Sequence, residues 1–524
     1  MNLYKATASI GGLTMLSRVA GFAREMLMAR IMGASAAADA FFVAFRLPNT
    51  FRRLFGEGAF SAGFVPLFSQ RLHGQGGMED AKRFSEEVLA VFFPTLILFT
   101  LLFTVIMPGF VALLTGYGGE KLELSTFLTR ITFPYLLLIS LVSLFSGILN
   151  SLTRFAAAAF APALLNFTML LALVLVPVGG ETTATALAIA VTLGGVVQLA
   201  LLVISARRAG VSLRIRRPRV TPGVRQFVRV VIPATFGAGV YQISAFIDTF
   251  FLSRIGEGAL SWFNYADRLN QLPLGVIGAA LGTAILPQVS RHVGAGDARA
   301  AADVQSRAAE LAMLLCLPAA LALGVAAGPL VAALFQGGQY TAEDARITAG
   351  TLAFIVSGLP AYVLVKVLTP GFYARQDTMT PVKIAVVVLL ANLVLNFVLI
   401  PPFGIYGLGA AIAICSWLNC LLLYFILHRR GHFRIDRRLA GRVARQLVAG
   451  LAMAAALWGV REVLPGFFAG STIQRIVGVG ALVGVGMIVY FGVGWLVGAV
   501  DKDELRALFR RGSGRKAAAA AGAP

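Results

Sequence analysis

The sequence contains the run AVFFPTLILFTLLFTVIMPGFVALL at residues 90–114, and no charged side chain interrupts it. An α-helix rises about 1.5 Å per residue, so about 20 apolar residues cross the roughly 30 Å hydrocarbon core of a bilayer. This run is therefore long and apolar enough to be a transmembrane helix. A transmembrane β-barrel would instead need short strands of alternating hydrophobicity, which the sequence lacks.

The composition of the whole chain agrees with this segment. Of the 524 residues, 58% are hydrophobic and 13% are charged, and the mean hydropathy is +0.81. Soluble domains carry about one quarter charged residues, so this chain needs lipid as its solvent. The net charge of +21 would suggest nucleic-acid binding in a soluble protein, but the basic residues lie in short connections between apolar runs. We therefore expect no nucleic-acid partner.

Apolar segments with helical periodicity follow one another along the chain. They cover residues 6–32, 37–70, 84–114, 125–150, 155–177, 183–206, 224–253, 259–291, 304–335, 345–373, 381–400, 407–428, 441–463 and 474–499. The sequence thus predicts an all-α membrane protein with about 14 transmembrane helices.

The connections between these segments alternate in charge. The connection after the second segment carries Arg71, Lys82 and Arg83, whereas the next one carries one Lys against two Glu. Further basic clusters lie at residues 207–219 and 429–438. The positive-inside rule places the basic connections in the cytoplasm, and both termini are then cytoplasmic as well.

The longest basic linker divides the first twelve segments into two groups of six. Several residues recur in the same order in both groups: Asn49, Pro66 and Ser69 as Asn270, Pro287 and Ser290, and Pro134 and Asn166 as Pro360 and Asn392. Because six is an even number, the groups would be parallel repeats. The predicted organisation is an N-lobe (1–206), a cytoplasmic linker (207–223), a C-lobe (224–430), two extra helices (431–500) and a cytoplasmic tail (501–524).

Several segments carry charges where a lipid-facing helix would be apolar. In the first segment, Ser17 and Arg24 are seven residues apart, as are Arg18 and Glu25, so both pairs lie on neighbouring stripes of one helix. The second and eighth segments add Asp39, Arg46, Arg52, Arg53, Glu57, Asp267 and Arg268. An Arg near the bilayer centre costs at least about 2.5 kcal/mol on insertion scales, so this set predicts a wet or protein-lined interior.

These intramembrane charges are mostly cationic. Excess positive charge in a cavity favours an anionic ligand, and the planar guanidinium fork suits phosphate. In the structural alternative, each Arg snorkels to the interface or pairs inside the protein, as Arg18 could with Glu25. That alternative explains single residues but not the set. Arg24, Arg52 and Arg268 lie near the middle of three different segments, and snorkelling does not require such an arrangement.

Three other function classes compete with an anion transporter. A membrane enzyme would need a catalytic cluster, but the four histidines lie at basic segment ends without an evident metal-ligand set: His73, His292, His428 and His432. No Lys follows a Gly, so a phosphate-binding P-loop is absent from the sequence. A drug/cation antiporter would need a net acidic cavity, and a scaffold would not need intramembrane Arg.

The charged stretches resemble the MurJ (MviN) family of lipid II flippases, within the multidrug/oligosaccharidyl-lipid/polysaccharide exporter superfamily. The matching stretches are SRVAGFARE at 17–25, DAFF at 39–42, RLPN at 46–49, RRLFGEGAF at 52–60, YADRL at 265–269, and Gly282-Thr283 with Leu286-Pro287. The resemblance covers about residues 1–500.

This resemblance implies a V-shaped, two-lobed monomer in the cytoplasmic (inner) membrane that flips lipid II outward by alternating access for peptidoglycan synthesis. Lipid II is an undecaprenyl-diphosphate-linked disaccharide pentapeptide, and the other partners would be membrane lipids. The residues that match the family's substrate site are Ser17, Arg18, Arg24, Glu25, Arg52 and Arg268. Acidic partners in switching would be Asp39, Glu57 and Asp267. The resemblance implies a transporter rather than an enzyme, and places the lipid tail in a groove of the two extra helices.

Some members of the family also bind sodium between the seventh and eleventh segments. Asp248 is similar here, together with Asn392 and Asn396, which lie at i and i+4 on one helical face. The alternative for these three residues is hydrogen bonding between helices. Sodium is therefore the one candidate cofactor. The sequence leaves the energy source of transport open between the membrane potential, a sodium gradient and a proton gradient.

Overall fold

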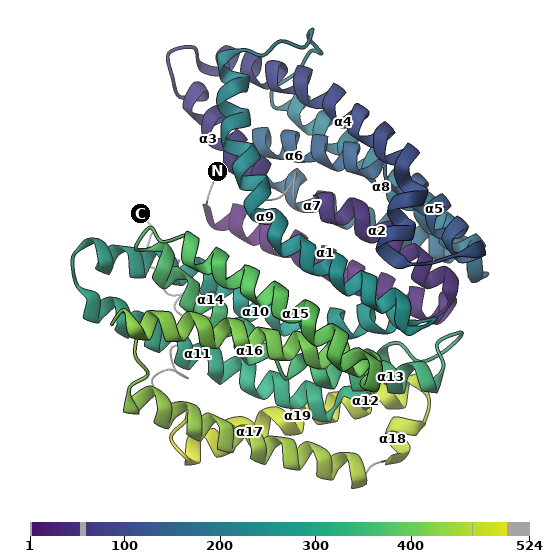
Figure 1. Ribbon diagram of the computed structural model, residues 1–524, viewed down its shortest axis with the longest axis vertical. Coiled ribbons are helices and arrows are strands. Elements are labelled where there is room, and N and C mark those ends of the chain that lie inside the picture. Colours follow the sequence, from purple (N-terminus) through teal and green to yellow (C-terminus); the bar gives the residue numbers. More distant parts are fainter. Residues whose placement is uncertain (1–2, 53–58, 464, 500–524) are drawn as a thin grey trace, which may run out of the picture. The chain divides into compact units, whose positions relative to one another are not determined.

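A computed structural model describes residues 3–52, 59–463 and 465–499 (Figure 1). Throughout these residues the secondary structure is helical, apart from an isolated β-bridge between Gly337 and Tyr340. Ten helical spans in the described part of the chain are long and apolar enough to cross a membrane. The predicted all-α membrane class is confirmed.

Each of the ten spans coincides with one of the fourteen predicted segments. They are Gly77–Thr115, Gly119–Ser151, Phe155–Leu175, Gly180–Arg208, Ala298–Val325, Ala342–Tyr373, Met379–Phe403, Ile405–Arg429, Arg437–Val463 and Thr472–Leu496. The other four predicted segments each include side chains outside the described part of the protein: 6–32, 37–70, 224–253 and 259–291. The total of fourteen crossings therefore stays a prediction.

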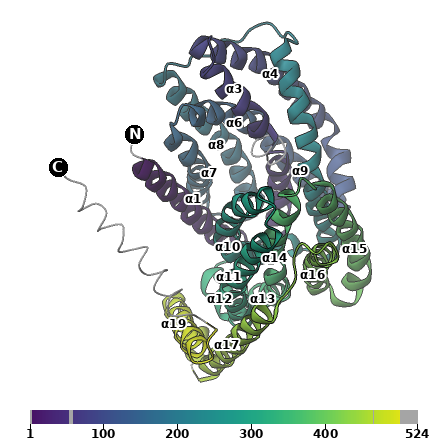
Figure 2. The ribbon, with the colours of Figure 1, turned by 90° about the vertical axis from the view of Figure 1, so that its left-hand side faces the viewer.

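The chain divides into two compact units, and the first comprises Met1–Ser261 and Gly337–Asp344. Its helices are α1 (Leu3–Met32), α2 (Ala36–Arg52), α3 (Ala59–Leu72), α4 (Gly77–Thr115), α5 (Gly119–Thr132), α6 (Tyr135–Ser151), α7 (Phe155–Leu175), α8 (Gly180–Arg208) and α9 (Pro222–Ile255). In this unit α1 packs along α7, as Figure 2 shows, and α7 packs along α8.

The extent of the first unit differs from the predicted N-lobe, which ends before the linker at 207–223. Helix α9 follows the linker and yet packs against α3 and α4. The rings of Phe227 and Phe60 meet edge to face, with their centroids 5.3 Å apart. A Cβ on Gly63 would lie 2.6 Å from Val231 Cγ2, so any larger residue there would force the Val231 side chain or one of the two helices to shift. These contacts join α9 to the helices that precede the linker.

The second unit comprises Trp262–Gln336 and Ala345–Pro524. Its helices are α10 (Ala259–Gly294), α11 (Ala298–Val325), α12 (Ala327–Leu334), α13 (Ala342–Val356), α14 (Leu359–Tyr373), α15 (Met379–Phe403), α16 (Ile405–Arg429), α17 (Arg437–Val463), α18 (Pro465–Ala469) and α19 (Thr472–Leu496). Helices α17 and α19 lie side by side (Figure 1) and pack on the rest of the unit through α11 and α12. The Tyr490 hydroxyl donates to the backbone oxygen of Leu314 at 2.9 Å.

Two spans are broken at corresponding places. The span Gly119–Ser151 changes from α5 to α6 at Pro134, and the span Ala342–Tyr373 changes from α13 to α14 just before Pro360. Proline has no N–H to continue a helical ladder, so a break at these positions follows from the sequence. The two prolines are one of the residue pairs on which the predicted repeat rests, and the repeat itself stays a prediction.

Candidate functional site

Arg24 lies in a buried polar cluster where α1 packs against α7. Its Nη1 donates a hydrogen bond to Asn166 Oδ1 at 3.0 Å, and its Nη2 lies 2.5 Å from Glu25 Oε1. Asn166 also donates to the backbone oxygen of Ser17 at 3.0 Å. Arg24 and Glu25 are each only 7% exposed, so their charges are shielded from bulk water. The hydrogen bond from Arg24 to Asn166 fixes the orientation of the buried guanidinium.

One donor of this guanidinium has no acceptor in the described part of the chain. The Arg24 Nε is buried and makes no hydrogen bond to any described residue. Leaving a buried donor unsatisfied costs about 1–3 kcal/mol, and more for a charged group, so such donors are rare without a functional reason. The Phe45 ring lies 5.7 Å from Arg24 Cζ. The cluster therefore has one N–H with which it could still bind an anion.

The pairing of Arg18 with Glu25, considered above as the structural alternative, is not the pair that the structure records. Glu25 pairs with its neighbour Arg24, and Arg18 is exposed. Seven residues correspond to about 10 Å along a helix, whereas adjacent long side chains can fold back on each other. Internal pairing thus applies to Arg24, which has Glu25 as a partner, whereas for the exposed Arg18 snorkelling to the interface stays open as the structural alternative.

Asp39 is completely buried near the start of α2 and binds the chain between α9 and α10. Its Oδ2 accepts from Gly258 N at 2.8 Å and from Lys121 Nζ at 3.2 Å. Its Oδ1 accepts from the backbone N and the hydroxyl of Ser261, at 3.0 and 2.8 Å. A carboxylate in this position caps the amino end of α10, where free N–H groups and the helix dipole favour negative charge.

A second carboxylate makes the reciprocal contact. Glu257, just before α10, accepts a hydrogen bond from the backbone N of Ala36, the first residue of α2, at 2.8 Å. The start of α2 and the start of α10 are therefore each capped by an acid from the other. Asp39 is thus part of a backbone junction with a lysine partner, and its predicted role in switching remains untested.

The remaining charges of α2 lie on its later turns. Arg46 Nη1 donates to Thr249 Oγ1 on α9 at 2.5 Å. Arg52, at the end of α2, is half-buried, and its Nε donates to Asn49 Oδ1 at 2.9 Å. Glu57 lies outside the described residues. Between residues 11 and 52 the chain carries five Arg against one Glu and one Asp, which keeps this region cationic.

The predicted charges of the eighth segment lie on α10 within the second unit. Arg268 and Asp267 are both half-buried, and Asp267 Oδ2 accepts from Gln271 Nε2 at 2.5 Å, one turn later. Arg24 and Arg52 belong to the first unit. The convergence of these three arginines on one ligand therefore stays a prediction.

The two asparagines of the candidate sodium site are buried together on α15. Asn396 Nδ2 donates to Asn392 Oδ1 at 3.3 Å, and Asn396 Oδ1 is buried without a hydrogen-bond partner among the described residues. Amide oxygens are suitable ligands for a hard cation. Asp248 is half-buried on α9, in the first unit, so the three-residue site also stays a prediction. No group of three or more His, Cys, Asp or Glu that could hold a metal occurs among the described residues.

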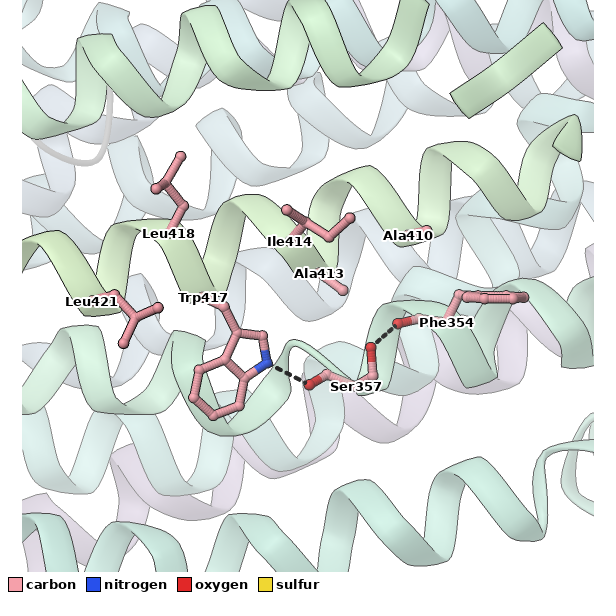
Figure 3. A pocket seen from close by; sticks show the side chains of 8 residues that line it. All are labelled: Phe354, Ser357, Ala410, Ala413, Ile414, Trp417, Leu418 and Leu421. Atoms are coloured by element: carbon pink, nitrogen blue, oxygen red, sulfur yellow. Dashed lines mark hydrogen bonds between the residues drawn. The ribbon is translucent and has the colours of Figure 1, made fainter. Parts of the chain in front are cut away.

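The second unit has an apolar groove of about 390 Å³ beside the break between α13 and α14 (Figure 3). The lining residues come from α13, from the turn that follows it and from α16: Phe354, Ser357, Ala410, Ala413, Ile414, Trp417, Leu418 and Leu421. The Trp417 indole donates to the Ser357 backbone oxygen at 3.0 Å and so satisfies a carbonyl that the helix break exposes. None of the described residues that line this groove is charged, so the lining offers no cation to an anionic headgroup.

Three residues of the polar clusters were missed as site residues in the sequence. Asn166 served only as a repeat marker, although a polar side chain in an apolar run could have indicated a buried partner. Lys121 lies in a connection that looked solvent-exposed, and Ser261 lies at the start of an apolar segment. Their partners are 82 to 222 residues away in the chain, and nothing in the local sequence indicates such contacts.

Comparisons with known proteins agree on one family. A family model described as "Lipid II flippase MurJ" matches residues 28–478. A probable lipid II flippase MurJ of Rhizobium tropici is 41% identical over 98% of this chain and 97% of its own length. A lipid II flippase MurJ of Burkholderia cenocepacia is 37% identical over 95% of this chain and 98% of its own length.

Solved structures give the same architecture. A lipid II flippase MurJ in an inward closed conformation matches with a TM-score of 0.76 and 22% sequence identity. The match covers 93% of this chain and 98% of the chain in that structure. An inward-facing multidrug resistance transporter of the MATE family matches with a TM-score of 0.66 and 14% sequence identity. This match covers 81% of this chain and 97% of the chain in that structure. At these identities the structures establish the fold alone, and the sequence comparisons establish the family.

Proposed function

Because the chain belongs to the lipid II flippase MurJ family, we propose that it moves lipid II from the inner to the outer leaflet of the cytoplasmic membrane for peptidoglycan synthesis. The family is one of transporters rather than enzymes, and the chain is a multi-pass membrane protein. Its cargo would be amphipathic, with a long apolar tail and a diphosphate-linked head. The protein must shield that head from hydrocarbon, since charge transfer into lipid is costly.

The observation that carries this proposal is the buried guanidinium of Arg24. It is held by Asn166 and Glu25 and keeps an Nε–H without an acceptor among the described residues. Charge-assisted hydrogen bonds to phosphate are about twice as strong as neutral ones, and a preoriented donor loses less entropy when it binds. A diphosphate oxygen would satisfy this donor.

The other family-matched residues complete the proposed site. Arg18, Arg52 and Arg268 would bind the diphosphate and the sugar head, with Ser17 and Glu25 beside them. Asp39, Glu57 and Asp267 would be the acidic partners that exchange contacts as the protein alternates between inward and outward access. The polyprenyl tail would stay in the bilayer, next to α17 and α19. A monomer would be sufficient for this cycle.

A reconstituted flipping assay tests the function directly. Purified protein in vesicles should move fluorescent lipid II between leaflets faster than protein-free vesicles do. A polyprenyl diphosphate lipid without the sugar and peptide tests how much of the recognition depends on the head. If lipid II stays in its original leaflet under an imposed potential, a sodium gradient and a proton gradient alike, the proposed function is wrong.

We also propose a sodium site formed by Asp248, Asn392 and Asn396. The buried Asn396 Oδ1 supports it, because a cation would satisfy this oxygen. Sodium should then raise the melting temperature of the wild-type protein, and Asp248→Ala or Asn392→Ala should weaken that rise. Choline replaces sodium at equal ionic strength as the control. A wild-type melting temperature that ignores sodium would remove the site.

The proposed topology has both termini and the linker at 207–223 in the cytoplasm. Charge supports it, since the last turn of α8 carries Arg207 and Arg208, whereas the segment 116–123, at the start of α5, has two acids and one Lys. Single-cysteine labelling in whole cells should therefore modify the segment at 337–344 from outside and spare the linker. Labelling of the linker from outside would overturn both the topology and the parallel repeat.

A further inference from the structure

The basic linker between α8 and α9 follows an irregular path that the first unit fixes at both ends. At its start, Val211 is fully buried, and its backbone N donates to Ala206 O at 2.9 Å. At its end, Thr221 accepts from Val224 N as the N-cap of α9 and donates its hydroxyl proton to Glu87 Oε2 at 2.7 Å. Residues 211–221 of the linker thus form a strap between the end of α8 and the start of α9 that also contacts α4.

The middle of the strap is held by one buried acid. Glu86 on α4 is only 1% exposed. Its Oε1 accepts from the backbone N of Arg214 at 3.1 Å, and its Oε2 lies 2.5 Å from Arg216 Nε. A buried carboxylate that binds a backbone N–H sets the direction of the chain there, because it would be costly to leave it unpaired. Glu86 therefore positions the residues on either side of it.

The outward face of the strap alternates positive charge with apolar side chains. Arg214, Arg217 and Arg219 are exposed. Between and beside them, Ile215 is 73% exposed and Val220 is 69% exposed. The stretch 211–221 contains no acidic residue. The preceding candidate span ends at Arg208, three residues before Val211, which would place the strap next to the membrane surface.

We propose that the strap, residues 211–221, is an interfacial binding site for anionic phospholipid headgroups. Arg217 and Arg219 would bind lipid phosphates, while Ile215 and Val220 enter the boundary between headgroups and acyl chains. Polypeptide with Lys or Arg next to exposed apolar side chains takes this position in membranes, and its attraction to anionic lipid is screened by salt. This lipid contact is separate from the transported lipid and does not depend on the proposed flippase activity.

An environment-sensitive fluorophore on Val220→Cys tests the proposal in the full-length protein. Background labelling should be low, because Cys316, Cys415 and Cys420 are all buried. The labelled protein is placed in nanodiscs of phosphatidylcholine alone, or with about 30% phosphatidylglycerol. We expect a blue shift and roughly a twofold rise in emission with the anionic lipid at about 0.1 M salt, and loss of most of it at about 1 M salt.

Charge variants separate this site from a general attraction of a basic protein to an anionic surface. Arg217→Gln with Arg219→Gln should abolish the lipid-dependent shift. Arg299→Gln with Arg307→Gln removes the same charge from exposed positions on α11 and should leave the shift intact. An equal shift in neutral nanodiscs would contradict anionic recognition. A label that stays in water in both lipids would mean that the strap faces a soluble partner, and would overturn the proposal.

Discussion

Two buried ion clusters of this protein are built from the same residue types and yet differ in what they leave unsatisfied. In the first unit, the cation Arg24 is buried beside Glu25 and retains an Nε–H without an acceptor among the described residues. In the second unit, the buried group is the acid Glu310, which is 5% exposed. Arg442 Nη1 lies 3.1 Å from its Oε2, and Arg438 Nε lies 3.4 Å from its Oε1.

The carboxylate of Glu310 is paired on both oxygens, whereas the guanidinium of Arg24 keeps a donor without an acceptor among the described residues. Both carboxylate oxygens of Glu310 have a cationic partner, and Gln446 donates to its backbone oxygen at 3.3 Å. The cluster joins α11 to α17, and its buried Gln446 Oε1, which has no hydrogen-bond partner among the described residues, is an acceptor that an anion would not satisfy. A buried carboxylate with a cation on each oxygen holds helices together, whereas a buried cation with a spare donor is suited to receive an anion. Burial alone does not distinguish the two roles.

The largest effect is expected for the function of Arg24 variants. Arg24→Lys keeps a charge next to Glu25 but loses the planar fork, so it should fold and yet fail to complement a flippase-depleted strain. Arg24→Ala should fail as well, and it should also lower membrane levels, because it leaves Glu25 buried without this partner. Complementation and quantitative blotting measure the two effects. Full complementation by Arg24→Lys would mean that the cluster is structural, like that of Glu310.

Glu310 variants should show the opposite pattern, with an effect on stability and little on transport. Glu310→Ala removes the acceptor for both arginines and should lower the free energy of unfolding by roughly 2 kcal/mol. Glu310→Gln keeps the shape and one acceptor and should lose less. Thermal unfolding in detergent measures the loss, and flipping per folded molecule should match the wild type. A transport defect in a fully stable Glu310 variant would remove the contrast between the clusters.

Asn166 tests whether the orientation of Arg24 matters in addition to its charge. Asn166→Leu removes the acceptor of Arg24 Nη1 and the donor to Ser17, so we expect a stability loss of about 1 kcal/mol. The flipping rate at equal protein amount should fall, but by less than in Arg24→Lys. Gln198→Leu, which removes a buried hydrogen bond from α8 to the backbone oxygen of Ala161 on α7, is the matched control and should leave the flipping rate unchanged. An unchanged flipping rate in Asn166→Leu would show that Arg24 needs no positioning by α7.

The smallest effect is expected for the exposed ion pair between Arg430 and Asp377, with which the effects at the two buried clusters can be compared. The Thr380 and Arg430 side chains hold the pKa of Asp377 at about 2, below its usual value near 3.8. A lowered folded-state pKa stabilises the protein above the unfolded-state pKa, and this contribution disappears as the pH falls toward 2. Arg430→Ala should therefore lower the melting temperature slightly at neutral pH, and the difference should shrink below about pH 4. A difference that persists at pH 2 would point to lost packing instead.

The sequence predicted much of the fold because hydropathy is a local property. The ten spans each match a predicted segment, and the breaks near Pro134 and Pro360 follow from the missing proline N–H. The assignment of α9 to the first unit was not predicted, because it depends on the fit of Gly63 to Val231, between residues 168 positions apart (231 minus 63). A linker rich in Arg looks like a domain boundary in sequence, whereas contacts between residues far apart in the chain set the extent of the compact unit.

For the candidate site, the sequence by itself determined which residues are charged, that they lie in segments where charge is costly, and which family they match. Only the tertiary structure decided their partners: Arg24 with Asn166, and Asp39 with Ser261 and Lys121. The physical reason is that insertion into lipid depends on the composition of each segment, whereas an ion pair depends on which helices pack together and in what rotation. Charge is carried by the residue itself, and its role depends on the neighbours that folding brings to it.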